Sequence, residues 1–292
     1  MRASKLKHEL TGWGFVALAS VLIVIFFFYP MANALWLSFH SGLGVNLNFV
    51  GLANYQRLFQ DATFLAAVRN TFIYLIIQVP LMIVLALFFS TLLNQKGLRF
   101  RGFFRTAIFL PAITSLVAYS TVFSMLFGYQ GLINSVLMDW GIIQSNVAWL
   151  SDPFFARATI IMAITWRWTG YNMIFYLSAL QNVDPAIYEA AKIDGASGIQ
   201  QFFKITIPML KPIILFTSIM STNGTLQLFD EVVNITGGGP GHSTLTISQY
   251  VYNLSFVFTP DFGYAATVSY AILILVTLLA FIQFKFVGGD NQ

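Results

Sequence analysis

The sequence contains no cysteine, and only 9% of its 292 residues are charged. Without thiols, the chain has neither a disulfide framework nor a zinc or iron–sulfur site built on thiolates. About a quarter of the residues of an ordinary soluble domain are charged. Here 57% are hydrophobic and 16% are aromatic, and the mean hydropathy is +0.74. This composition indicates a membrane protein.

Several functional groups that would mark other classes of protein are also missing. The net charge of +4 comes from basic residues spread along an apolar chain, without the dense basic patch of a nucleic-acid-binding protein. His8, His40 and His242 lie in separate segments without metal-ligand spacing. The chain has no Gly-x-x-x-x-Gly-Lys-Ser/Thr phosphate loop. We therefore expect no nucleic acid partner, no metal site, no catalytic residues and no cofactor bound by this chain.

Six apolar runs are long enough to cross a bilayer, which needs about 20 residues per helix. They cover approximately residues 13–37, 72–93, 106–127, 158–180, 213–229 and 264–284. The first run exceeds the apolar stretch of a signal peptide, which is about 7–15 residues, so we expect a retained helix. The pattern predicts an all-α membrane protein in which residues 1–292 form a single domain with six transmembrane helices.

The positions of Lys and Arg predict the orientation, because short segments that carry them stay in the cytoplasm. With the N-terminus inside, only Arg57, Arg69 and Arg157 fall in the outer segments, and Arg167 falls within the fourth run. All the other basic residues lie inside. Both termini are therefore expected to be cytoplasmic.

The segment between the fourth and fifth runs, residues 184–208, has the features of two short helices joined by a turn. Asp184 is suited to cap a helix that has Pro185 at its first position. Glu-Ala-Ala-Lys at 189–192 favours helix, and Gly195 is expected to end it. A second helical stretch is expected over 197–204, before Pro208 and Pro212 mark the entry to the fifth membrane helix. The small residues of this loop permit close approach by another protein.

This loop resembles the signature of the membrane subunits of bacterial ATP-binding-cassette importers. That signature is Glu-Ala-Ala, three residues, Gly, nine residues, Ile, one residue, Leu-Pro. The matching positions are Glu189, Ala190, Ala191, Gly195, Ile205 and Pro208, and Ile207 replaces the Leu. Two further segments, residues 51–55 and 236–241, resemble the carbohydrate-uptake, maltose-transporter-like branch of the family.

The resemblance implies a type I importer permease fold in the bacterial cytoplasmic membrane. It also implies partners: a second permease, two ATPase subunits that bind ATP and magnesium, and an extracellular solute-binding protein. The residues implied to contact an ATPase groove are Glu189, Ala190, Ala191, Asp194, Gly195 and Ala196. The outer loop Gly237, Gly238, Gly239 and Pro240 is implied to reach the binding protein, although an exposed connection is an equal alternative.

Polar and aromatic residues in two of the runs are candidates for a substrate pathway, because polar groups within a membrane are costly and tend to face a cavity. They are Arg167, Trp168, Tyr171 and Asn172 in the fourth run, and Asn223 and Gln227 in the fifth. The resemblance to maltose-type permeases implies Gly224 as a further pathway residue, and it also favours Tyr171, Asn223 and Gln227. Aromatic faces and amides suit a sugar. Helix packing is the alternative for each residue, and for Arg167 a pair between helices or subunits.

We therefore expect a permease that carries a sugar or oligosaccharide. A glycerol phosphoester is an alternative cargo, with Arg167 meeting the phosphate. An ion-coupled secondary transporter would need carboxylates deep in its spans, whereas Asp230 and Glu231 fall at the outer edge of the fifth run. A membrane enzyme would need a set of paired acid–base groups or a nucleophile with its base, which the sequence does not offer.

Overall fold

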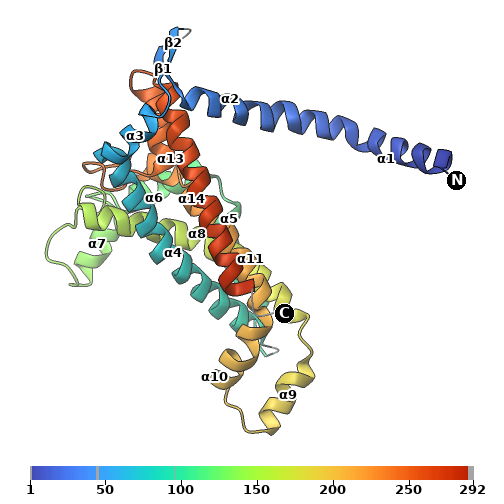
Figure 1. The fold of residues 1–292 in the computed structure, drawn as a ribbon. Helices are drawn as coiled ribbons and strands as arrows, with labels where there is room; N and C mark the ends of the chain where they lie inside the picture. The colour runs from blue at the N-terminus through green and yellow to red at the C-terminus, as the bar shows by residue number, and fades with distance from the viewer. Residues whose placement is uncertain (1, 44–45, 96, 289–292) are drawn as a thin grey trace. The chain divides into compact units, whose positions relative to one another are not determined.

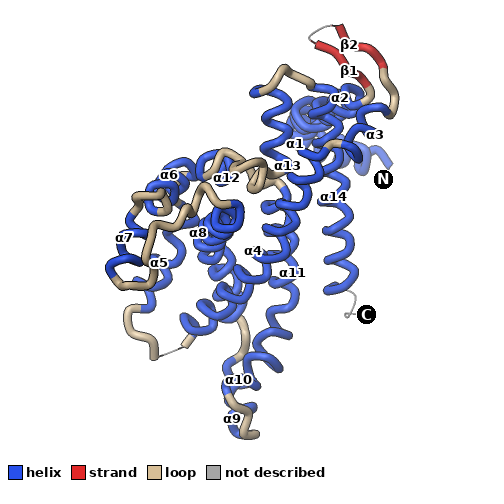
Figure 2. Tube along the Cα trace, turned by 90° about the vertical axis from the view of Figure 1, so that its left-hand side faces the viewer, coloured by secondary structure: helices blue, strands red, loops and turns tan. Residues whose placement is uncertain are grey.

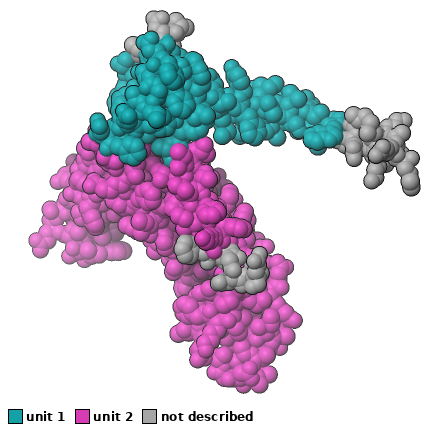
Figure 3. All heavy atoms as spheres, in the orientation of Figure 1, with its two compact units in different colours: residues 1–61, 251–271 teal, residues 62–250, 272–292 magenta. Residues whose placement is uncertain are grey.

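The structure is a computed structural model that describes residues 2–43, 46–95 and 97–288. It consists almost entirely of helices, with one two-stranded antiparallel sheet (Figure 1). The chain forms two compact units, residues 1–61 with 251–271 and residues 62–250 with 272–292 (Figure 3).

The elements follow one another with few long connections. They are α1 (Arg2–Ile23), the π-helix η1 (Val24–Phe28), α2 (Tyr29–Ser38), β1 (His40–Leu43), β2 (Asn46–Phe49), α3 (Ala53–Gln60), α4 (Ala62–Asn94), α5 (Arg101–Ile113), α6 (Leu116–Leu126), α7 (Leu132–Asp139), α8 (Pro153–Gln181), α9 (Pro185–Ile193), α10 (Gly198–Gln201), the π-helix η2 (Phe202–Thr206), α11 (Ile207–Leu226), α12 (Asp230–Ile235), α13 (Ile247–Tyr252), the π-helix η3 (Asn253–Val257) and α14 (Phe262–Gly288).

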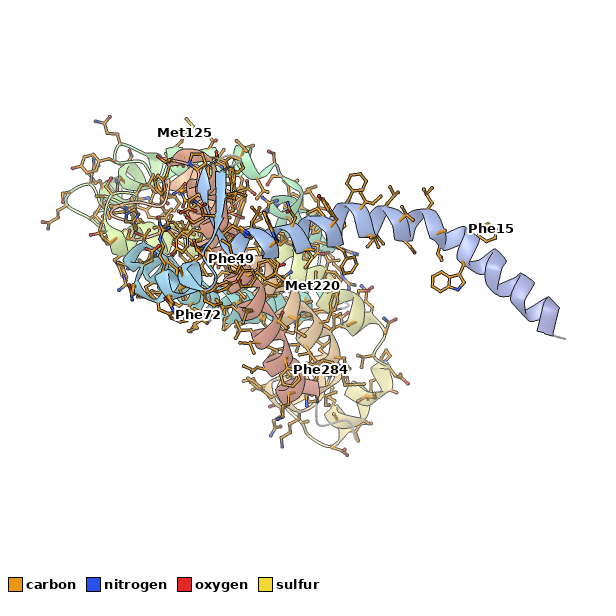
Figure 4. All side chains as sticks on the ribbon, turned by 45° about the horizontal axis from the view of Figure 1, so that its top comes forward. Phe15, Phe49, Phe72, Met125, Met220 and Phe284 are labelled. Carbon is orange, nitrogen blue, oxygen red and sulfur yellow. The ribbon has the colours of Figure 1, made fainter. Side chains whose placement is uncertain are left out.

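In the first unit, α1, η1 and α2 continue one another as a single apolar helix. Phe15 projects away from this helix (Figure 4) and is 85% exposed, and most side chains between Trp13 and Trp36 are exposed as well. No part of its most apolar stretch is buried within the described structure. Such a surface requires lipid or another membrane protein around it.

One asparagine side chain links α3 to the end of α2 and the start of β1. β1 pairs with β2 so that His40 lies opposite Phe49, and Gly51 turns the chain into α3 with a φ of +56°. The Asn54 amide then donates hydrogen bonds to the carbonyls of Ser38, at 3.0 Å, and His40, at 2.9 Å. Residues 51–55 therefore form a turn whose buried amide fastens α3 to the end of α2.

The start of α14 is held against α3 in the same unit. Arg57 Nη1 donates to Asp261 Oδ2 at 2.8 Å, and the guanidinium lies 3.8 Å from the centre of the Tyr264 ring. The Tyr264 hydroxyl donates to Asp61 Oδ2 at 2.7 Å. These contacts fix the two ends of the unit to each other.

The second unit is organised around α4, α8 and α11, which lie alongside one another (Figure 2). Its largest core cluster contains Ala86, Leu87, Leu93, Met173, Tyr176, Leu177, Leu180 and Leu210. α5 also packs against α8, where a Cβ atom at Gly170 would overlap the Ile108 carbonyl. Glycine is therefore required at this crossing.

Four described helices are long and apolar enough to cross a membrane: Trp13–Ser38, Ala62–Asn94, Gly198–Leu226 and Phe262–Lys285. The expected third run is not one straight helix, because α5 and α6 are bent by 99°. They make a fifth candidate if the pair is taken as one broken span. Pro111 has no amide hydrogen, and the Thr114 hydroxyl donates to its carbonyl at 2.7 Å where α5 ends. α8 covers the expected run 158–180 but is not among the candidates.

Candidate functional site

The second unit encloses a cavity of about 420 Å³ between α4, α8 and α11. This volume lies within the usual range of small-molecule sites, about 300–1,000 Å³. Six of the seven residues predicted to line a pathway lie on its wall: Trp168, Tyr171, Asn172, Asn223, Gly224 and Gln227. The seventh, Arg167, is not on the wall.

One side of the cavity is a row of aromatic rings. The Trp168 and Tyr171 rings lie 5.7 Å apart and meet edge to face, and Phe175 follows 5.1 Å from Tyr171. Phe216 on α11 continues the row, 5.9 Å from Phe175. Helical spacing places these three residues of α8 near one another.

The α11 side of the wall carries amides and a hydroxyl. Gln227 Nε2 donates to Asn223 Oδ1 at 2.5 Å, and Ser221 lies on the same wall. An amide retains spare donors and acceptors after making one hydrogen bond. Polar groups of this kind beside aromatic rings match the hydroxyls and the C–H faces of a sugar.

Sequence reasoning missed the contribution of α4 to the cavity. Gln78 and Met82 lie on the wall, and Gln78 is 2% exposed. The available signal was a single amide in the otherwise apolar run Ile76-Ile77-Gln78-Val79, because a polar residue inside a membrane helix usually has a role.

Arg167 is 7% exposed and lies behind the wall among other side chains. Its guanidinium is 4.9 Å from the centre of the Tyr119 ring and 5.4 Å from that of Trp168. It also interacts electrostatically with Glu231, which lines the cavity beside Asp230. Burial raises the pKa of the Glu231 carboxyl, while Tyr119 and Arg167 oppose that rise. Arg167 therefore acts on Glu231 from behind the wall.

Residues 184–196 of the loop have the local structure that their sequence predicts. Asp184 caps α9 by accepting a hydrogen bond from the Ala186 amide at 2.9 Å. Gly195 has a φ of +80° and follows the helix end, and the Ala196 amide donates to the Ala191 carbonyl at 2.9 Å. None of the α9 residues is buried in the structure, so their surface is free to contact another chain.

The predicted entry to the fifth membrane helix is wrong in one respect. α10, η2 and α11 run without a break, so the helix that contains Pro208 and Pro212 begins at Gly198. Ser197 and Gln200 form a capping box at this start. The π-turn over Phe202–Thr206 comes just before Pro208, where the ring removes a backbone donor without ending the helix.

The glycine-rich outer segment is tied down by hydrogen bonds. Thr244 Oγ1 donates to the Gly239 carbonyl at 2.7 Å and lies 2.8 Å from Thr236 Oγ1. The segment just beyond is fastened to α4 by Asn70, which donates to two of its carbonyls. Gly237 and Gly238 have φ values of +63° and +89°, which only glycine adopts readily. Residues 237–240 therefore form a turn that hydrogen bonds hold in place.

A helical membrane protein with a partly polar cavity and an exposed short helix, α9, has the architecture of a permease component. The chain belongs to the family described as binding-protein-dependent transport system inner membrane component, which matches residues 63–287. It is a multi-pass permease of the inner membrane, and ATP hydrolysis in such systems belongs to separate subunits.

Known relatives are similar to this chain over nearly their full length. The lactose transport system permease protein LacF of Rhizobium radiobacter is 55% identical, over 96% of this chain and 95% of that protein. The arabinooligosaccharides transport system permease protein AraP of Halalkalibacterium halodurans is 34% identical, over 92% of this chain and 85% of that protein. A bacterial ABC transporter that imports the acidic polysaccharide alginate has a chain of the same fold, with a TM-score of 0.85 and 22% identity over 100% of both chains. The predicted ABC importer permease fold is thereby confirmed.

Proposed function

We propose that this chain is the permease subunit of an ATP-driven importer for an uncharged sugar or oligosaccharide. The observation that carries the proposal is the cavity wall, on which a row of aromatic rings faces amide and hydroxyl groups. The sugar systems named for the LacF and AraP relatives support it.

The charges of the cavity favour an uncharged sugar over a phosphoester. Among the described lining residues, the charged ones are the acids Asp230 and Glu231. A phosphate in this space would be repelled by the Asp230 carboxylate, and by Glu231 whenever that group is ionised. Arg167, which would be its natural partner, lies off the wall, so the described lining residues offer a phosphoester no cationic side chain.

The proposal includes the finer arrangement expected from the sequence. Residues 1–292 form a single membrane domain with six spans, in which α5 with α6 and the less apolar α8 supply two. The exposed α9 and the turn at Gly195 contact the ATPase subunits, and residues 237–240 contact the solute-binding protein. A second permease completes the pathway. Together with lipid, it covers the apolar surface of α1.

The test is uptake by proteoliposomes that contain the complex purified from its native membrane, with its binding protein added. A panel of radiolabelled sugars, with lactose and an arabinose oligosaccharide first, is compared with glycerol phosphoesters, with and without ATP inside. The proposal predicts ATP-dependent uptake of at least one uncharged sugar and none of the phosphoesters. Uptake of phosphoesters alone, or sugar uptake without ATP, would contradict it.

A double variant tests the cavity itself. Replacing Asn223 and Gln227 with Leu removes both amides from the wall and is expected to lower sugar uptake at least tenfold while ATPase subunits still co-purify. Each lost hydrogen bond costs about 1 kcal/mol, and the added side chains narrow the site. Unchanged uptake would assign both residues to helix packing.

A further inference from the structure

The amide of Gln78 lies in the middle of α4, a 33-residue helix that is otherwise almost wholly apolar in this region. It is 2% exposed, yet it lies on the cavity wall. A buried amide is costly unless its donors and its acceptor are satisfied. The hydrogen-bond partners of the Gln78 amide therefore indicate which ligand group the cavity can bind at this point.

The carbonyl of this amide is well paired, and its NH₂ group is not. Gln78 Oε1 accepts a hydrogen bond from Thr225 Oγ1 at 3.1 Å. Gln78 Nε2 donates to the thioether sulfur of Met82 at 3.4 Å. A thioether is a weak acceptor, so the NH₂ group is held by a poor partner.

A second amide converges on the same sulfur from another helix. Asn172 Nδ2 on α8 lies 3.3 Å from Met82 Sδ and donates its other hydrogen to the Trp168 carbonyl at 3.0 Å. Gln78, Met82 and Asn172 all line the cavity. Two strong donors thus point at one weak acceptor, on the wall of a cavity that Trp168 also lines.

We propose that Gln78 and Asn172 form a binding subsite for one hydroxyl oxygen of the transported sugar. This oxygen replaces the Met82 sulfur as the acceptor of both amides. A hydroxyl oxygen has two lone pairs and is a better acceptor than sulfur. It takes one hydrogen bond from each amide, while the sugar face rests against Trp168. This inference rests on the proposed function, and it makes α4 a determinant of sugar specificity.

The experiment measures how strongly the transporter discriminates against loss of one hydroxyl. The probe is the sugar that the wild type takes up best from the panel above, compared with a set of its monodeoxy analogues. The discrimination ratio is the uptake rate of the parent sugar divided by that of each analogue. Because every variant is assayed with the same binding protein, the contribution of that protein cancels when variants are compared.

Gln78→Met keeps the length of the side chain and removes the amide. It is expected to lower the discrimination ratio about threefold to tenfold for one monodeoxy analogue and to leave the others unchanged, as expected for loss of one hydrogen bond. The matched control is Ser90→Ala, also a buried polar group of α4, whose hydroxyl donates within its own helix to the Leu87 carbonyl at 2.9 Å. Its ratios should equal those of the wild type.

A second variant covers the case in which Gln78→Met does not assemble. Met82→Leu removes the sulfur that competes for both amides, so the ratio for the same analogue should rise about twofold. A uniform loss of uptake with unchanged ratios in Gln78→Met, or unchanged ratios in Met82→Leu, would overturn the subsite and leave the sugar importer standing. If the wild type takes up no sugar of the panel, the proposed function fails and the subsite fails with it.

Discussion

The hydroxyl oxygens of Tyr176 and Thr217 lie 2.6 Å apart and join α8 to α11 in the core of the second unit. These two helices are the ones that the loop 184–208 connects. If α9 couples to the ATPase subunits as proposed, its movement would act on two helices that are joined to each other beside the cavity.

Tyr176→Phe tests how much this link contributes. The Thr217 hydroxyl still donates to the Ile213 carbonyl, so we expect a loss of only about 1 kcal/mol and a small fall in the melting temperature of the detergent-purified complex. Tyr176→Ala also empties a fully buried position, and should cost about 3–5 kcal/mol. Equal losses in the two variants would contradict a hydrogen bond of this modest size.

A substitution at Gly195 tests the role of the turn after α9. Its φ of +80° disfavours any other residue, and a long basic side chain would project from the exposed surface. We expect Gly195→Arg to abolish uptake while ATP hydrolysis by the complex continues.

The matched control for this turn is Gly198→Arg. Gly198 starts α10, its φ needs no glycine, and a Cβ there meets no atom within 4 Å. The control should retain more than half of wild-type uptake. Equal loss in both variants, or normal coupling in Gly195→Arg, would remove the special role of the turn.

The electrostatic interaction between Arg167 and Glu231 predicts a pH dependence. The charged and titratable groups around Glu231 are Tyr119, Arg167 and Asp230. Because burial raises the pKa of Glu231, the folded protein favours its protonated form, and stability falls as pH rises above the usual carboxyl pKa of about 4.3. Arg167 limits that fall by stabilising the carboxylate.

Arg167→Leu should therefore lower the melting temperature of the complex more at pH 8 than at pH 5. Arg167→Leu leaves the Glu231 carboxylate as an uncompensated buried charge at pH 8. Adding Glu231→Gln removes that charge and should therefore recover part of the loss at pH 8. The same loss at both pH values would show that the arginine acts only through packing against Tyr119.

The close approach of α5 and α8 at Gly170 leaves no room for a larger side chain at this position. Gly170→Ala would push a methyl group into the Ile108 carbonyl and is expected to lower the melting temperature by several degrees. Gly102→Ala on α5 meets no atom within 4 Å and should be neutral or slightly stabilising, as alanine favours helix. Equal melting temperatures for the two variants would contradict the close packing.

Local features of this fold could be predicted from sequence because short-range chemistry determines them. Asp184 and Gly195 bracket α9 as expected, and the pathway residues Tyr171 and Asn223 reach one cavity because each lies on a long helix of the second unit. What the sequence did not reveal depends on contacts between distant segments. The bend near Thr114, the continuity of the helix through Pro208 and the entry of Gln78 into the cavity wall all follow from how α4, α5, α8 and α11 pack.

If the cavity between α4, α8 and α11 holds the sugar during ATP-driven import, a bound sugar must shield the groups on its wall. Since the chain has no cysteine, Ser221→Cys places a single thiol on the cavity wall for measurement of its modification rate by a small thiol reagent in the reconstituted complex. We expect the transported sugar to slow this modification at least threefold and a non-transported stereoisomer to leave it unchanged. ATP binding should change the rate further. Equal rates with both sugars and with or without ATP would contradict a sugar site in this cavity.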